Sequence, residues 1–107
     1  MVEIVWSEPA LGDLDTIADY IALENPDAAA ELVKRVFEHV AQLATHPDSG
    51  SRPPEFKHSR YRQRVESPCR IFYRHDGHKV FIVHVMRSER LLRKRQQLAN
   101  HAGQAKT

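Results

Sequence analysis

The order of elements predicted along this chain favours an α+β fold. A short apolar strand comes first, two amphipathic helices follow with almost no loop between them, and three more strands come after. Strands and helices segregated in this way typically build a mainly antiparallel sheet with the helical hairpin on one face. A short C-terminal helix is expected over residues 90–98. Because 107 residues leave room for one core, we expect a single domain over residues 1–98 and a flexible tail over residues 99–107.

The first strand and the first helix are predicted within residues 2–24. Residues 2–6, VEIVW, are β-branched and aromatic, which is typical of a strand. Ser7 is a suitable N-cap, and Pro9 falls in the first helical turn, where its missing N–H is tolerated. Apolar residues then recur at helical spacing until near Glu24, which indicates an amphipathic helix. They are Leu11, Leu14, Ile17, Ala18 and Ile21.

A second helix is predicted directly after the first. Asn25 is a suitable cap and Pro26 suits the first helical position, so the chain restarts there with almost no loop. The helix is expected to end by His46 and Pro47, and its apolar stripe is interpreted as core. The stripe consists of Leu32, Val33, Val36, Phe37, Val40, Leu43 and Ala44.

Three strands are predicted in the second half of the chain. Residues 47–58, PDSGSRPPEFKH, are rich in Pro, Gly and Ser and are expected to form an irregular connector. Asp76 and Gly77 are a tight-turn signal between two β-rich runs, which predicts a hairpin. The three strands are expected at residues 61–65, 70–75 and 79–86.

Composition excludes several classes of protein. Cys69 is the single cysteine, which rules out an intramolecular disulfide. No apolar run approaches the roughly 20 residues of a membrane span, and the N-terminus lacks the features of a signal peptide. The histidines lack a tight metal-ligand spacing, so we assign no metal and no cofactor. We expect a cytoplasmic protein without a membrane partner.

Charge is divided unevenly along the chain. Residues 1–51 hold ten acidic residues against two basic ones, a net charge of −8. Residues 52–107 hold fourteen basic residues against four acidic ones, a net charge of +10. This asymmetry favours a surface for an acidic or anionic partner, although attraction between the two halves of the fold is an alternative.

Three phrases of the sequence together resemble one known family. They are SEPALGDLDTIADYIALENPDAA from residue 7, SGSRPPE from residue 49 and CRIFYRHDGHKVFIVHVMRSERLL from residue 69. In this order they are similar to the ParE branch of the RelE/ParE toxin superfamily, with the match covering roughly residues 2–93. The resemblance implies a toxin of a type II toxin–antitoxin system. Its expected partners are a cognate antitoxin, which keeps it inactive, and DNA gyrase, with any contact with DNA being indirect.

RelE-like members of the superfamily instead cleave messenger RNA on the ribosome, which requires proton-transfer groups and cations on the phosphate. Arg70 and Arg87 match arginines of the RelE-like pattern. The tyrosine, or histidine–tyrosine pair, that this pattern places after the last strand is missing. His84 is a substitute, but its alternation with Val80 and Ile82 predicts a histidine packed on the apolar face. The enzymatic alternative therefore has Arg70, His84 and Arg87 as its catalytic residues.

The arginines of the second half favour docking over catalysis. Guanidinium groups bind carboxylates and phosphates in a bidentate manner, but they do not act as proton shuttles at neutral pH. We therefore expect no catalytic residue, and a stripe of arginines across the sheet that binds the target or the antitoxin. A solvated face with scattered ion pairs is the alternative. The stripe consists of Arg60, Arg62, Arg64, Arg70, Arg74, Arg87, Arg90 and Arg93.

Overall fold

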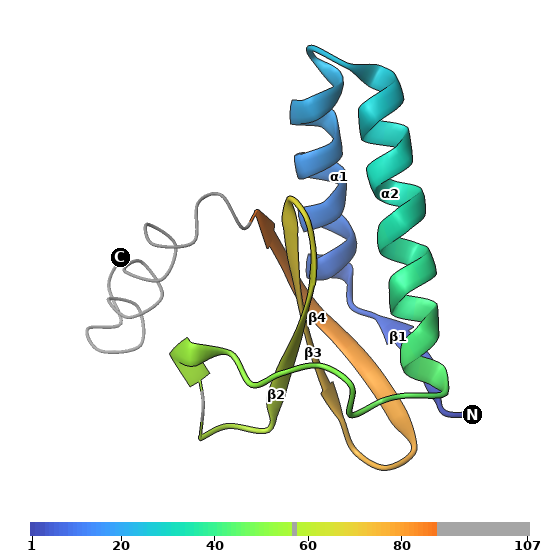
Figure 1. The fold of residues 1–107 in the computed structure, drawn as a ribbon, viewed down its shortest axis with the longest axis vertical. Coiled ribbons are helices and arrows are strands. Elements are labelled where there is room, and N and C mark those ends of the chain that lie inside the picture. The colour runs from blue at the N-terminus through green and yellow to red at the C-terminus, as the bar shows by residue number, and fades with distance from the viewer. Residues whose placement is uncertain (57, 88–107) are drawn as a thin grey trace.

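The computed structural model describes residues 1–56 and 58–87 and has the predicted α+β architecture (Figure 1). The helix predicted over residues 90–98 and the tail predicted over residues 99–107 lie outside the described residues. The main elements are β1 (Glu3–Trp6), α1 (Glu8–Ala22), α2 (Pro26–Ala41), β2 (Tyr61–Glu66), β3 (Cys69–His75) and β4 (Lys79–Arg87). Two short 3-10 helices, η1 (Gln42–Ala44) and η2 (Pro54–Phe56), belong to the connection between α2 and β2.

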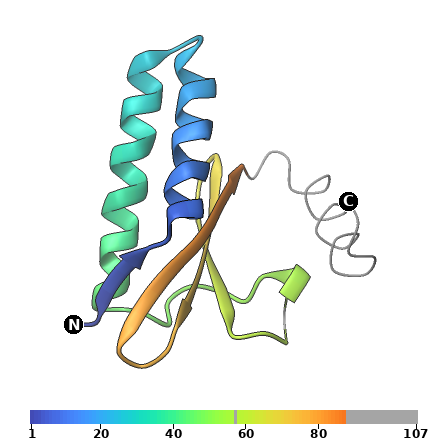
Figure 2. The same cartoon turned by 180° about the vertical axis from the view of Figure 1, so that it is seen from behind.

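The four strands form one sheet in the order β1-β4-β3-β2. β2 pairs with β3 and β3 pairs with β4 in antiparallel orientation, as predicted, whereas β1 pairs with β4 in parallel. The helical hairpin of α1 and α2 packs against the sheet, and its free end projects beyond the ends of the strands (Figures 1 and 2). The first and last described strands are therefore direct neighbours, although the rest of the fold separates them in sequence.

Both helices begin at the predicted caps. The Ser7 side chain accepts a hydrogen bond from the Ala10 N–H at 3.1 Å, and the Asn25 side chain accepts one from the Ala28 N–H at 3.0 Å. Each cap satisfies one of the backbone donors that the first turn of a helix leaves without a partner. Pro9 and Pro26 lie in the first turns of their helices, where no N–H is needed.

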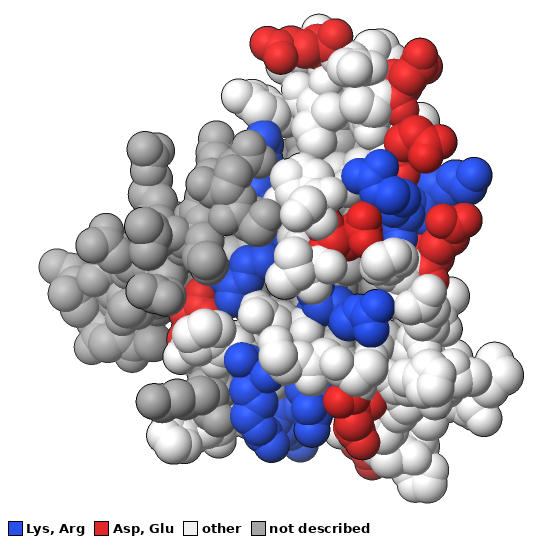
Figure 3. Space-filling view, in the orientation of Figure 1, with Lys and Arg blue, Asp and Glu red and all other residues white. Residues whose placement is uncertain are grey.

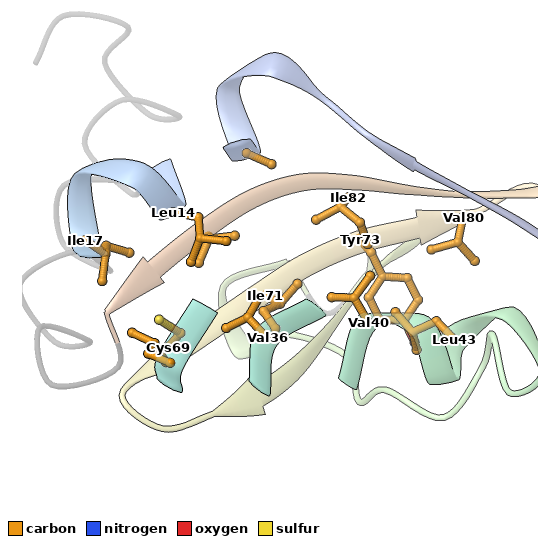
Figure 4. Packing of buried hydrophobic residues seen from close by; sticks show 13 residues of the cluster. Leu14, Ile17, Val36, Val40, Leu43, Cys69, Ile71, Tyr73, Val80 and Ile82 are labelled. Atoms are coloured by element: carbon orange, nitrogen blue, oxygen red, sulfur yellow. The ribbon is translucent and has the colours of Figure 1, made fainter. Parts of the chain in front are cut away.

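The core lies between the helical hairpin and one face of the sheet (Figure 4). Leu14, Val36 and Val40 from the helices meet Ile71 and Ile82 from the strands, and all five are almost completely buried. Two residues of the predicted stripes are instead 40% and 41% exposed, and the expectation that they lie in the core is wrong. They are Leu11 and Phe37, of which Phe37 packs on the ring of Trp6 at a centroid distance of 4.8 Å.

Tyr73 fixes the connector to the core. Its ring is fully buried, and its hydroxyl accepts a hydrogen bond from the Gly50 N–H at 2.9 Å. A Cβ at position 50 would lie 2.5 Å from the Gln63 carbonyl oxygen and 2.6 Å from the Tyr73 hydroxyl, so this close approach requires glycine. Burial raises the pKa of Tyr73, while the bond from Gly50 opposes that shift.

The predicted hairpin between β3 and β4 turns at Asp76 and Gly77. Gly77 has a φ of +95°, a backbone conformation that glycine adopts without strain. The Asp76 carboxylate accepts hydrogen bonds from the N–H groups of His78 and Lys79, both at 2.9 Å. These two bonds lower the pKa of Asp76.

A β-bulge in β4 moves His84 away from its predicted position. Phe72 pairs with His84 and Tyr73 pairs with Ile82, so the register skips Val83. A bulge of this kind shifts the alternation of side chains by one residue. The His84 side chain is 63% exposed as a result, and the expectation that it packs with Val80 and Ile82 is wrong.

Candidate functional site

The strand register divides the predicted arginine stripe between two faces of the sheet. Arg62 lies opposite Tyr73, so it points to the face that the helices cover. Arg64, two residues further along the strand, points to the same side. Successive residues of a strand point to opposite faces of the sheet. Arg70 and Arg74 are each next in sequence to a β3 residue that faces the helices, so they lie on the other face, which we call the outer face. The expectation of a single stripe is therefore wrong for these four arginines.

Arg62 and Arg64 hold the connector against the sheet. Arg62 donates a hydrogen bond to the carbonyl oxygen of Gly50 at 2.9 Å, and Arg64 donates one to the Ser49 hydroxyl at 2.9 Å. Arg62 also lies 3.7 Å from a carboxylate oxygen of Asp48. These contacts bring the connector to the edge of β2, where Ser51 forms a bridge with Gln63. Both guanidinium groups therefore have a structural role.

Arg70 is a buried cation with its own set of partners. It is 2% exposed, and its two terminal nitrogens donate to the Glu55 carboxylate at 2.8 and 2.9 Å. Its Nε donates to the Gln63 side chain at 2.8 Å, and its guanidinium carbon lies 4.7 Å from the centroid of the Phe72 ring. A bidentate contact with a carboxylate uses the same donors that would bind a phosphate. Glu55 therefore occupies the position that an anionic ligand would take.

The other predicted arginines are less enclosed. Arg74 stacks on the ring of Phe81 at 4.2 Å on the outer face, and Arg60 is exposed just before β2 begins. In Figure 3, Lys and Arg side chains lie over the sheet and its loops and also on α2, with some Asp and Glu side chains between them, whereas the charged side chains at the free end of the helical hairpin are Asp and Glu. Arg90 and Arg93 lie outside the described residues.

The last part of β4 stays paired with β3, but its pairing with β1 ends at Ile82. Trp6 pairs with Ile82, and the Ser7 N–H then donates to the Ile82 carbonyl oxygen at 3.0 Å. Beyond this point, side chains of the N-terminal region replace a strand. The Ser7 hydroxyl donates to the Val83 carbonyl oxygen at 3.3 Å, and the Asp13 carboxylate accepts from the Val85 N–H at 3.1 Å.

His84 and Arg87 also contact residues of α1. The Nδ1 atom of His84 lies 3.2 Å from the same oxygen of Asp13 that accepts from Val85. The Arg87 guanidinium stacks on the ring of Tyr20 at 4.8 Å. Arg87 pairs in register with the buried Cys69, so its side chain points to the face that the helices cover.

A cleft of about 250 Å³ lies between α1 and the end of β4. Four of its residues recur on α1 at spacings of three and four, which places them on one face of the helix. The sequence prediction included Arg87 but missed the α1 residues, of which only Ile17 was assigned a place, in the apolar core stripe. The lining consists of Asp13, Thr16, Ile17, Tyr20, Val85, Met86 and Arg87.

The three residues of the enzymatic alternative are not brought to one face. By the strand register, Arg70 and His84 lie on the outer face of the sheet, whereas Arg87 points to the face that the helices cover. Arg70 is enclosed by Glu55, and His84 contacts Asp13. Within residues 1–56 and 58–87, no group of three or more His, Cys, Asp or Glu side chains is placed to hold a metal ion. In the same residues no helix is long and apolar enough to cross a membrane.

The fold is shared with a toxin–antitoxin protein of known structure. A structure described as the chromosomal ParDE TA system from P. aeruginosa superposes with a TM-score of 0.64 and 26% sequence identity. The match covers 81% of this chain and 96% of the other. This similarity defines the class: a small α+β toxin of a type II toxin–antitoxin system.

Sequence comparison then gives the family. The family model for the ParE toxin of the type II toxin–antitoxin system parDE matches residues 4–92, and the chain belongs to this family. A relative named "Putative toxin Y4kP", from Sinorhizobium fredii, is 42% identical over 71 residues, which cover 66% of this chain and 73% of the relative. A protein of this class has an antitoxin as its partner.

Proposed function

We propose that this ParE-type toxin arrests growth by binding DNA gyrase, without catalysing a reaction of its own, and that its cognate antitoxin neutralises it. Membership of the ParE family supports gyrase as the target. The buried state of Arg70 supports binding over catalysis. An arginine that is 2% exposed and held by both oxygens of Glu55 is not available to a phosphate in a transition state.

The direct test uses purified gyrase with purified toxin. We expect this protein to inhibit supercoiling and to increase the amount of cleaved DNA that stays bound to gyrase. The toxin should be refolded and checked by circular dichroism before use, so that a lack of inhibition is not caused by misfolding. Unchanged supercoiling and unchanged cleavage with folded toxin would contradict gyrase as the target.

A triple variant tests which surface acts on the target. Replacing Arg87, Arg90 and Arg93 by alanine removes three cations near the C-terminal end of the match and should abolish growth arrest. The control is Lys34→Ala, which removes an exposed cation on α2 that is not among the arginines predicted to bind. If the folded triple variant arrests growth as strongly as the parent, the target binds elsewhere.

One observation favours the second candidate, a ribosome-dependent mRNA endonuclease. His84 is exposed and lies 3.2 Å from the Asp13 carboxylate, and a histidine beside a carboxylate is a common general base. Mapping of mRNA 5′ ends within minutes of expression distinguishes the two functions. Codon-linked cuts that disappear in His84→Gln would establish the endonuclease, whereas intact messages with gyrase-linked breaks would support the proposed function.

A further inference from the structure

The free end of the helical hairpin carries two large, exposed apolar side chains. Leu23 is 81% exposed, and Tyr20, one turn before it in α1, is 55% exposed. Because Leu23 keeps helical backbone angles (φ −57°, ψ −34°), the two side chains lie on the same side of the helix. Single exposed apolar residues are common, but a pair at this spacing is the pattern with which a helix docks in a groove of a partner.

The turn between the two helices has a defined backbone. The N–H groups of Glu24 and Asn25 donate to the Ile21 carbonyl oxygen at 3.1 and 2.9 Å, and the Ala29 N–H donates to the Asn25 carbonyl oxygen at 3.1 Å. The apolar side chain of Leu23 takes no part in these bonds, so the turn does not depend on a leucine at this position. A side chain on an ordered backbone loses little conformational entropy when it binds, so the turn is preorganised for a partner.

The position of this turn makes it accessible to a large partner. The hairpin projects beyond the ends of the strands, so a partner can reach Leu23 without meeting the sheet (Figures 1 and 2). Tyr20 stacks on Arg87 at the end of β4, whereas Leu23 lies one turn further toward the free end of the hairpin. The apolar pair therefore runs from the end of β4 out to the turn.

The charge around the turn has one sign. Residues 7–33 hold seven acidic residues and neither Lys nor Arg, which gives this stretch a net charge of −7. Asp19, Glu24 and Asp27 are exposed next to the apolar pair in sequence, and the charged side chains at the free end of the hairpin are acidic (Figure 3). An acidic surface with an apolar centre is complementary to a surface rich in Lys and Arg that contains an apolar recess.

Gyrase is a partner with the required charge. An enzyme that binds DNA has surfaces rich in Lys and Arg, because these side chains neutralise the phosphate backbone. The second half of this chain has a net charge of +10 and is repelled by such a surface. The acidic end of the hairpin is therefore the part of the toxin whose charge attracts it.

We infer that the hairpin tip, residues 19–27, is a contact surface for gyrase. Tyr20 and Leu23 dock in an apolar recess of the enzyme, and the acidic residues of the tip face the Lys and Arg side chains around that recess. The inference rests on the proposed function, because it names the part of the toxin that meets the same target. It adds a surface that the predicted arginine stripe does not include.

The main test removes the side chain of Leu23. Full-length Leu23→Ala is titrated with purified gyrase by isothermal calorimetry, and inhibition of supercoiling is measured in parallel. We expect the affinity to fall by about 10-fold, because an apolar anchor is lost from its recess. The matched control is Leu11→Ala, the same substitution at a position of α1 that is 40% exposed and lies near the other end of the helix. It should bind gyrase like the parent.

A pair of charge reversals separates a local contact from the overall field of the protein. Glu24→Lys and Glu38→Lys change the net charge equally, but Glu24 lies in the hairpin tip and Glu38 is exposed in the last turn of α2. We expect Glu24→Lys to weaken gyrase binding more than Glu38→Lys, with a difference that shrinks at high salt. Circular dichroism and thermal unfolding confirm that each variant is folded. Parent-like affinity for gyrase in both Leu23→Ala and Glu24→Lys would overturn the inference.

The outcomes separate this inference from the proposed function. If the parent binds gyrase and the two tip variants bind it as tightly, only the inference fails. If the folded parent does not bind gyrase, the proposed function fails and the inference fails with it. Titration with the antitoxin of the same module and light scattering of the toxin alone test two other occupants of the tip. Loss of antitoxin binding or of a dimer in Leu23→Ala, with unchanged affinity for gyrase, would overturn gyrase as the occupant.

Discussion

Arg70 and Arg87 are close neighbours on the backbone but have different surroundings. Arg70 is the second residue of β3 and pairs in register with Met86 of β4. Arg87 is the last residue of β4 and pairs with Cys69 of β3, so the two arginines belong to adjacent register pairs. Arg70 points to the outer face, where Glu55 and Gln63 enclose it. Arg87 points to the helix side, where it stacks on Tyr20 at the cleft.

This difference shows that an arginine at the end of a strand has no fixed role. Alternation along the strand decides which face a side chain reaches, and the elements on that face decide its partners. On the outer face the connector supplies a carboxylate, so Arg70 becomes a structural cation. On the helix side α1 supplies the ring of Tyr20, so Arg87 stacks on an aromatic residue at the cleft.

The largest expected effect is on stability at Arg70. Arg70→Ala removes the bidentate contact of the buried Glu55 carboxylate with a buried cation, and we expect the free energy of unfolding to fall by about 3–5 kcal/mol. Guanidinium titration followed by circular dichroism measures the change. Arg74→Ala is the control, since it removes a half-buried arginine from the same face of the same strand and should cost less than about 1 kcal/mol. Equal losses in the two variants would contradict the structural role of Arg70.

The second prediction separates the ion pair from the space it fills. Combining Arg70→Met with Glu55→Leu removes both charges and keeps apolar volume in the same place. Because no charge is left buried alone, we expect this double variant to be at least about 2 kcal/mol more stable than Arg70→Ala. The same guanidinium titration decides it. A double variant as unstable as Arg70→Ala would mean that the geometry of the pair, rather than its unbalanced charge, stabilises the fold.

The third prediction concerns the support of the strand that carries Arg87. Asp13→Ala removes the acceptor of the Val85 N–H, and we expect a loss of about 1–2 kcal/mol in the free energy of unfolding. Asp13→Asn keeps an oxygen acceptor at this position and should lose less. Hydrogen exchange of the Val85 amide, measured by NMR, should become faster in Asp13→Ala. If exchange is unchanged, another group protects the end of β4.

The smallest expected effect on stability is at Arg87 itself. Arg87→Ala removes the stacking on Tyr20, and we expect the free energy of unfolding to change by about 0.5–1 kcal/mol. Thermal and guanidinium unfolding of parent and variant measure this change. A loss as large as that of Arg70→Ala would remove the distinction between the two residues, because Arg87 would then also be a structural cation.

Much of the fold follows from local patterns in the sequence. The caps at Ser7 and Asn25, the helical spacing of the apolar residues and the turn at Gly77 each depend on a few neighbouring residues. The predicted helices and strands therefore agree with the observed ones to within a few residues. The site was predicted less well, because its residues come from distant parts of the chain. Asp13 contacts Val85 across 72 positions of sequence, and no local pattern indicates such a pair.

The sequence by itself determined the order of the elements, the family of the protein and the accumulation of arginines in the second half. These depend on composition and on short-range periodicity, which are complete in the chain before it folds. Only the tertiary structure decided what each arginine contacts. The bulge at Val83 changes which face the following residues reach, and Glu55 meets Arg70 only when the connector packs on the sheet. The local sequence around an arginine is the same whichever face of the strand its side chain reaches, but the partners on the two faces differ.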